Sequence, residues 1–168
     1  MRKLIFLVGI SGSGKTTFIK NELLDNYSNS VIASRDELRN VLAAFKKSIV
    51  GYYSDTVNFS FREKFINVMM QHLIRFAAQR SMDIIIDATN LNVSYIKTII
   101  KEVESNADDY IIEYIVMNKS FDLQHCRKSV ELRDGLINEE LDYIDKQYKN
   151  FMYINETYLS EQENVTYV

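Results

Sequence analysis

The fold of this 168-residue chain is decided by the stretch Gly9-Ile10-Ser11-Gly12-Ser13-Gly14-Lys15-Thr16. It fits the pattern G-x-x-x-x-G-K-[ST] at every fixed position. The pattern needs glycines because the backbone must turn its N–H groups inward without Cβ clashes. Those N–H groups and the N-terminus of the following helix then cradle phosphate oxygens. The stretch therefore predicts binding of a nucleoside triphosphate, and a glycine-rich turn without a ligand is the disfavoured alternative.

Each polar position of this loop has an expected partner. Lys15 is expected to reach the β- and γ-phosphates of ATP, and the Thr16 hydroxyl is expected to bind Mg²⁺. The chain has only five glycines, and three of them fall within a span of six residues inside this loop. The predicted nucleotide-binding residues are Gly9, Ser11, Gly12, Ser13, Gly14, Lys15, Thr16 and Thr17.

Short apolar runs alternate with helical patterns along the whole chain. Strands are expected at 3–8, 30–33, 83–87, 110–116 and 165–168, and helices at 15–24, 58–81, 92–104 and 120–151, the last broken near Asp134-Gly135. This alternation predicts one α/β domain over residues 1–168, with a mainly parallel sheet in three layers and a helical lid at about 120–138. Ligands of such sheets bind at the carboxyl ends of the strands.

The expected helix 58–81 carries apolar residues at helical spacing. We expect this stripe to face the core, with His72 buried as part of it. Its members are Phe61, Phe65, Val68, Met69, His72, Leu73, Phe76 and Ala77.

The composition excludes several classes of protein. Hydrophobic residues make up 46% and charged residues 26%, which is not the balance of a disordered chain. A net charge of −3 excludes a basic field over the whole surface, so binding of a nucleic acid would need a local basic patch. The single cysteine, Cys126, excludes a disulfide framework and favours the cytoplasm. No segment approaches the ~18 uninterrupted apolar residues of a membrane span.

A second candidate motif, Ser34-Arg35-Asp36-Glu37-Leu38-Arg39, follows the second expected strand. Ser34 and Glu37 form a capping box, which places Asp36 in the first turn of a helix and Arg39 one turn later on the same face. An ionised Asp36 could accept the proton of a substrate hydroxyl, and Arg39 could hold an acceptor phosphate. An ordinary helix with a salt bridge between these two residues is the alternative.

The third expected strand ends at Asp87, beside the phosphate loop. An acidic residue there could hold a metal-bound water or orient Thr16. Asn92 is expected to cap the next helix. Farther along, Arg127 and Arg133 lie in a helical stretch that breaks at Gly135, and an arginine on such a lid could neutralise charge on the triphosphate. A solvated helix face with Glu131 and Asp134 as salt partners is the alternative.

Three motifs taken together resemble the kinase domain of phage-type polynucleotide 5′-hydroxyl kinases. They are the phosphate loop, Ser-Arg-Asp-x-x-Arg at 34–39 and Asp-x-Thr-Asn-Leu-Asn at 87–92, and the resemblance spans about residues 1–150. It implies that Asp36 is the general base, that Arg39 contacts the acceptor phosphate, and that Asp87, Thr89 and Asn90 shape the acceptor and phosphate pocket. The lid departs from the family's Arg-Asn-x-x-Arg-x-Gly pattern, because Lys128 replaces the asparagine, the arginines are farther apart and the following proline is missing.

The first hypothesis is therefore Mg²⁺-dependent transfer of phosphate from ATP to a 5′-hydroxyl of RNA or DNA, in the host cytoplasm if the protein is viral. A kinase of a small-molecule or modified-nucleoside hydroxyl is the second. A nucleotide-dependent switch or ATPase module acting on partner proteins is the third. A homo-oligomer is compatible with each of them.

Overall fold

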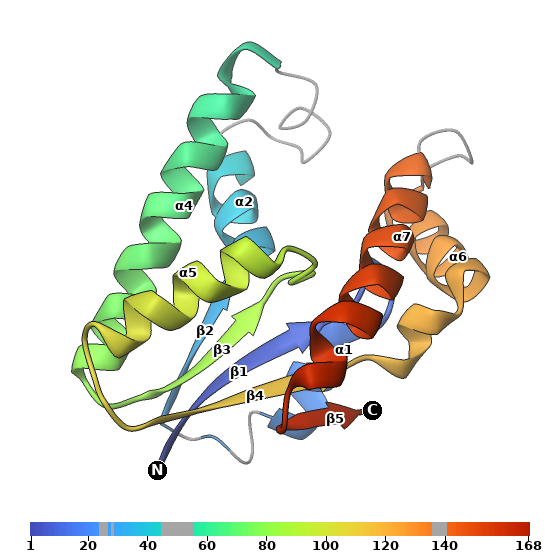
Figure 1. Ribbon diagram of the computed structural model, residues 1–168. Coiled ribbons are helices and arrows are strands. Elements are labelled where there is room, and N and C mark those ends of the chain that lie inside the picture. Colours follow the sequence, from blue (N-terminus) through green and yellow to red (C-terminus); the bar gives the residue numbers. More distant parts are fainter. Residues whose placement is uncertain (24–26, 28, 45–55, 136–140) are drawn as a thin grey trace.

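The computed structural model describes residues 1–23, 27, 29–44, 56–135 and 141–168. Its five strands form one sheet in the order β2-β3-β1-β4-β5, and every pairing is parallel (Figure 1). The strands are β1 (Arg2–Val8), β2 (Ser30–Ser34), β3 (Asp83–Asp87), β4 (Tyr110–Val116) and β5 (Val165–Tyr167). The expected strands are confirmed, and the sheet is a P-loop kinase-like α/β sheet.

The helices also follow the expected order. The loop leads into a short α-helix that continues as one π-helical turn, and Asn92 caps α5, its side chain accepting from the Tyr95 N–H at 3.1 Å. No helix of the described residues is long and apolar enough to cross a membrane. The helical elements are α1 (Lys15–Phe18), η1 (Ile19–Leu23), α2 (Arg35–Ala44), α4 (Thr56–Gln79), α5 (Val93–Glu104), η2 (Asn118–Phe121), α6 (Leu123–Asp134), α7 (Asp142–Thr157) and η4 (Leu159–Glu161).

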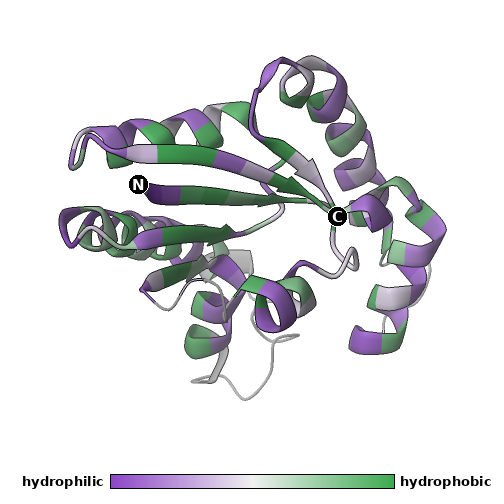
Figure 2. Cartoon of the chain, turned by 90° about the horizontal axis from the view of Figure 1, so that it is seen from below, coloured by the Kyte–Doolittle hydropathy of each residue, from purple (hydrophilic) through white to green (hydrophobic). Residues whose placement is uncertain are grey.

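The sheet is buried on both faces, as the apolar strands require. Side chains alternate between faces along β1. Leu4 and Phe6 join the larger core under α4, α5 and α7, whereas Ile5 and Leu7 join a smaller core under α1 and η1. Figure 2 shows the hydrophobic residues running along the strands between the helices. The three-layer arrangement is therefore confirmed.

The strand register brings the functional motifs to one edge of the sheet. Asp87 of β3 pairs with Leu7 of β1 on one side and with Ser34 of β2 on the other. The phosphate loop follows β1, and α2 follows β2, so both start from this edge. Parallel strands thus place three separate motifs together.

The prediction for the inward face of α4 was wrong. The buried residues among the described part of α4 pack toward the sheet; they are Ile66, Met70, Ile74, Ala77 and Ala78. Most of the expected stripe is on the opposite face: Phe61, Phe65, Val68, Met69 and Phe76 are 40–72% exposed, and His72 is exposed as well. Apolar residues occupy both faces of α4, and periodicity alone does not tell which face meets the sheet.

Candidate active site

The phosphate loop has the backbone conformation that its glycines predict. Gly12 has a φ of +83° and Gly14 a φ of +93°, both in the left-handed region that side chains disfavour. A Cβ on Gly12 would lie 2.3 Å from the carbonyl oxygen of Cys126, whereas one on Gly14 would meet nothing within 4 Å. The loop is thus packed against α6 at Gly12 and open at Gly14, where helix α1 begins.

Polar side chains from the C-terminal half fix this loop. The Ile10 N–H donates to Ser120 Oγ at 3.2 Å, and the Ser11 N–H donates to Gln147 Oε1 at 2.8 Å. Ser120 belongs to η2 and Gln147 to α7, so the helices after β4 are tied to the loop. Sequence reasoning missed both residues, because they lie more than 100 positions away and belong to no motif.

Lys15 lies folded over the loop. Its Nζ donates to the carbonyl oxygens of Gly9 at 2.8 Å and Ile10 at 2.9 Å. Burial lowers the pKa of Lys15 to about 8, against the opposing effects of the Asp87 and Asp36 charges. The charges of Asp87 and Asp36 therefore act on Lys15, so the structure brings these three predicted residues near one another.

This lowered pKa predicts a pH-dependent affinity for nucleotide. Because the phosphates need the ammonium form, ATP affinity of wild-type protein should fall about tenfold for each pH unit above about 8. Lys15→Arg keeps its charge and should show no such slope, whatever its absolute affinity. Calorimetric titration between about pH 7 and 10 measures both slopes. A wild-type affinity that stays flat up to pH 10 would contradict this account of Lys15.

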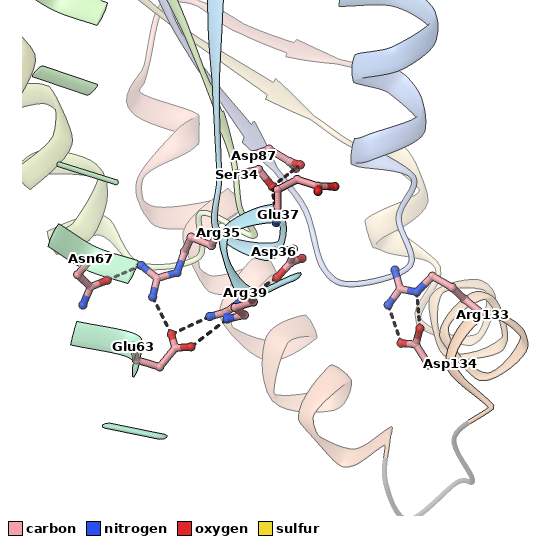
Figure 3. Close-up of polar contacts among 10 residues, drawn as sticks. All are labelled: Ser34, Arg35, Asp36, Glu37, Arg39, Glu63, Asn67, Asp87, Arg133 and Asp134. Carbon is pink, nitrogen blue, oxygen red and sulfur yellow. Dashed lines mark hydrogen bonds and ion pairs between the residues drawn. The ribbon is translucent and has the colours of Figure 1, made fainter. Parts of the chain in front are cut away.

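Asp36 lies on the exposed first turn of α2. Its side chain is 81% exposed, and its Oδ1 accepts from Arg39 at 2.7 Å (Figure 3). The pairing expected from the sequence is therefore present. Ser34 Oγ accepts from the Glu37 N–H at 3.4 Å, which is one half of the predicted capping box.

Glu63 of α4 fixes the arginines of α2. Its two carboxylate oxygens accept from Arg39 Nε at 2.9 Å and Arg39 Nη2 at 2.8 Å, and one also accepts from Arg35 Nη2 at 2.8 Å. Figure 3 shows both guanidinium groups converging on this one side chain, with Asn67 beyond Arg35. A planar, two-point pair of this kind holds a guanidinium in one orientation. No motif pointed to Glu63, which lies 24 residues after Arg39.

Asp87 is buried at the end of β3. Its Oδ2 accepts from Ser34 Oγ at 3.1 Å, and burial raises its pKa, against the effects of Lys15 and of this hydrogen bond. The Thr89 carbonyl accepts from the Gly9 N–H at 3.1 Å. The Asn90 amide donates to the Leu7 carbonyl at 2.8 Å and the Ile86 carbonyl at 3.1 Å, so it ties the ends of β1 and β3 together. Contact of any of these residues with an acceptor remains a prediction.

The two lid arginines are held in ion pairs. Arg127 Nη1 donates to both oxygens of Asp145 on α7 at 2.7 Å. Arg133, 62% exposed at the end of α6, pairs with the adjacent Asp134 at 2.7 Å. Figure 3 places this pair away from the group around Asp36. Arg133 thus has one of the salt partners that the alternative expects, and contact of either arginine with the triphosphate stays a prediction. Residues 136–138 of the expected lid lie outside the described part of the chain.

The loop fits a nucleoside triphosphate with its magnesium ion. Thr16 and Thr17 are exposed in the first turn of α1, and the open space at Gly14 gives phosphate access to the loop. Among the described residues, no three acidic, histidine or cysteine side chains are grouped to hold a metal.

Comparisons with solved structures support the fold. A chain of the Pnkp1/Rnl/Hen1 RNA repair complex matches 94% of this chain at 26% identity, with a TM-score of 0.68. This chain spans about half of that one, 46% of its length. A chain of the PezAT toxin–antitoxin system of Streptococcus pneumoniae matches 99% of this chain and 66% of its own length, at 21% identity and a TM-score of 0.65.

A putative kinase from Chloroflexus aurantiacus matches 99% of this chain and 87% of its own length, at 16% identity and a TM-score of 0.65. No curated protein matches the sequence. The family model AAA_33, described as an AAA domain, matches residues 4–117, which include the phosphate loop, α2 and β3. Nucleotide binding follows from this match, and the fold is that of P-loop kinases. The chain therefore belongs to the AAA_33 family of AAA domains.

Proposed function

We propose that the chain transfers the γ-phosphoryl group of ATP to the 5′-hydroxyl of RNA or DNA. One observation carries the proposal: an exposed carboxylate, Asp36, and a fixed guanidinium, Arg39, lie together on α2 at the edge of the sheet that holds the phosphate loop. The charge of Asp36 acts on Lys15 of that loop. A general base, an anion-binding arginine and a phosphate cradle are the parts that phosphoryl transfer to an alcohol needs.

Each side chain has a defined part in the proposed reaction. Asp36 takes the proton of the acceptor hydroxyl as its oxygen bonds to the γ-phosphorus, and the bond to the β–γ bridging oxygen breaks to release ADP. Lys15 neutralises charge on the β- and γ-phosphates, and Thr16 holds Mg²⁺, which supplies further charge neutralisation when bound. Arg133 and Arg127 would each leave its acidic partner and bind a phosphate of ATP instead.

A nucleic acid is proposed as the acceptor because Arg39, a guanidinium of the kind that binds phosphodiester oxygens, lies beside Asp36 at this edge of the sheet. Glu63 holds it by two hydrogen bonds, which leaves Nη1 directed to Asp36. The likeness to a chain from an RNA repair complex points the same way. Asp87, Thr89 and Asn90 complete the proposed pocket at the strand ends.

An acceptor panel tests this proposal. ATP labelled in the γ-phosphate is offered with 5′-hydroxyl RNA, 5′-hydroxyl DNA, 3′-nucleotides, nucleosides and sugars. Label on the oligonucleotides, with a rate that falls steeply with salt, is the expected result. Label found only on a nucleoside or a sugar would show that the acceptor is a small molecule and not a nucleic acid. Hydrolysis without transfer to any acceptor would favour a switch or ATPase module.

Substitution Glu63→Gln tests the role of the fixed arginines. Removing this charge loosens the hold on the guanidinium groups of Arg35 and Arg39, so we expect the KM for the acceptor to rise about tenfold while the KM for ATP stays unchanged. Glu102→Gln is a matched control, since Glu102 pairs with Arg75 at 2.8 Å on the far part of α4. An unchanged acceptor KM in Glu63→Gln would show that Arg39 needs no such support.

A further inference from the structure

The exposed face of α4 carries an apolar stripe. It consists of Phe61, Phe65, Val68, Met69, His72 and Phe76, which we call the α4 stripe. These residues span roughly 22 Å of helix and lie opposite the buried face formed by Ile66, Met70, Ile74 and Ala77. In Figure 1, α4 runs along the margin of the molecule and extends beyond the sheet. Among the residues that the structure describes, this outer face of α4 stays exposed.

The α4 stripe is large for a monomer surface. Its exposed side-chain area is on the order of 500 Å², at the upper end of the apolar patches found on monomeric proteins. A contiguous apolar patch of this size on a soluble protein is typical of a contact surface. Among the described residues, the sheet covers one face of α4, and most of the stripe side chains remain about half exposed on the other.

We infer that the α4 stripe is a dimer interface, covered by the α4 stripe of a second copy running antiparallel. The spacings between its six residues are 4, 3, 1, 3 and 4, which read the same in both directions. A two-fold axis between Val68 and Met69 therefore sets Phe61 opposite Phe76, Phe65 opposite His72 and Val68 opposite Met69 of the other copy. A two-fold interface requires such self-complementarity. The pair would cover roughly 1,000 Å² in total, the lower limit for a specific interface.

One of the two cations beside the stripe has an acidic partner within its own chain. Two-fold packing brings the flank that carries Lys64 and Arg75 against the same flank of the other copy. Arg75 is already paired with Glu102 of its own chain at 2.8 Å, so it adds no uncompensated cation there. The proposed dimer does not depend on the reaction that the protein catalyses.

The mass in solution is the first test. Sedimentation equilibrium of the whole chain from about 1 to 100 µM, which brackets the affinity of a small two-fold interface, should show a shift from 19.7 kDa toward twice that mass. Phe65→Lys should remain monomeric at all of these concentrations. Tyr153→Glu, at an exposed apolar position on α7, should dimerise like wild type. A monomeric wild type, or a Phe65→Lys variant that dimerises normally, would overturn the proposal.

A second test addresses the register. His72→Glu alone should also weaken the dimer, but the double variant Phe65→Lys/His72→Glu should restore it, because each new lysine faces a new glutamate of the other copy. The double variant Phe61→Glu/Phe65→Lys carries the same two charges, but its lysine does not face the glutamate of the other copy. It should therefore stay monomeric. Circular dichroism checks that every variant is folded. Failure of the facing pair to restore dimerisation, or equal dimerisation of the mismatched pair, would overturn the antiparallel arrangement.

Discussion

Replacing Asp36 by asparagine is expected to lower phosphoryl transfer about 10³-fold while ATP binding persists. The amide cannot take the acceptor proton, and the phosphate loop is untouched. The side chain of Asp36 is 81% exposed, so the fold should not depend on it. Transfer is measured with γ-labelled ATP and a 5′-hydroxyl oligonucleotide, and ATP affinity by calorimetry on the same sample.

A neighbouring carboxylate supplies the control for this experiment. Glu37 is also exposed on the first turn of α2, and Figure 3 shows it close to Asp36 and Asp87. Glu37→Gln should retain most of the wild-type rate. If Glu37→Gln abolishes transfer and Asp36→Asn does not, the base has been assigned to the wrong residue of this turn.

Substitution Gly12→Ala is expected to distort the phosphate loop and destabilise the fold. The new Cβ would lie 2.3 Å from the Cys126 carbonyl oxygen, and the backbone has a φ of +83°. Left-handed strain costs about 1–2 kcal/mol and overpacking about 1–3 kcal/mol, so the free energy of unfolding should fall by about 2–5 kcal/mol. Urea unfolding measures this loss, and nucleotide binding should be lost with it.

The substitution Gly14→Ala separates backbone strain from the steric clash with Cys126. Its φ of +93° brings the same strain, but its Cβ would meet nothing within 4 Å. We expect only about 1–2 kcal/mol of destabilisation there. Equal losses at the two glycines would mean that the contact between the loop and α6 contributes little.

Local patterns predicted most of the fold. Apolar runs such as Ile84-Ile85-Ile86 and caps such as Asn92 act through near neighbours in the sequence, so they can be recognised without a structure. The apolar spacing over residues 58–81 led to a wrong inward face for the same reason. Periodicity shows that a helix face is apolar, but contacts between distant segments decide whether that face meets the sheet or the solvent.

The candidate site was predictable where a motif defines it and unpredictable where distant residues support it. Lys15, Asp36 and Asp87 belong to motifs, and the parallel register brings them together. Glu63 and Gln147 act through single contacts with residues 24 and 136 positions away. Such pairings depend on how α4 and α7 pack on the sheet, which no local pattern encodes.

The most direct test of the central claim is a crystal structure with a non-hydrolysable ATP analogue, Mg²⁺ and a 5′-hydroxyl oligonucleotide. We predict that the Asp36 carboxylate lies within hydrogen-bond reach of the 5′-oxygen, about 2.6–3.2 Å, with that oxygen facing the γ-phosphorus. A carboxylate turned away from the γ-phosphate, with no space for an acceptor between them, would contradict the account.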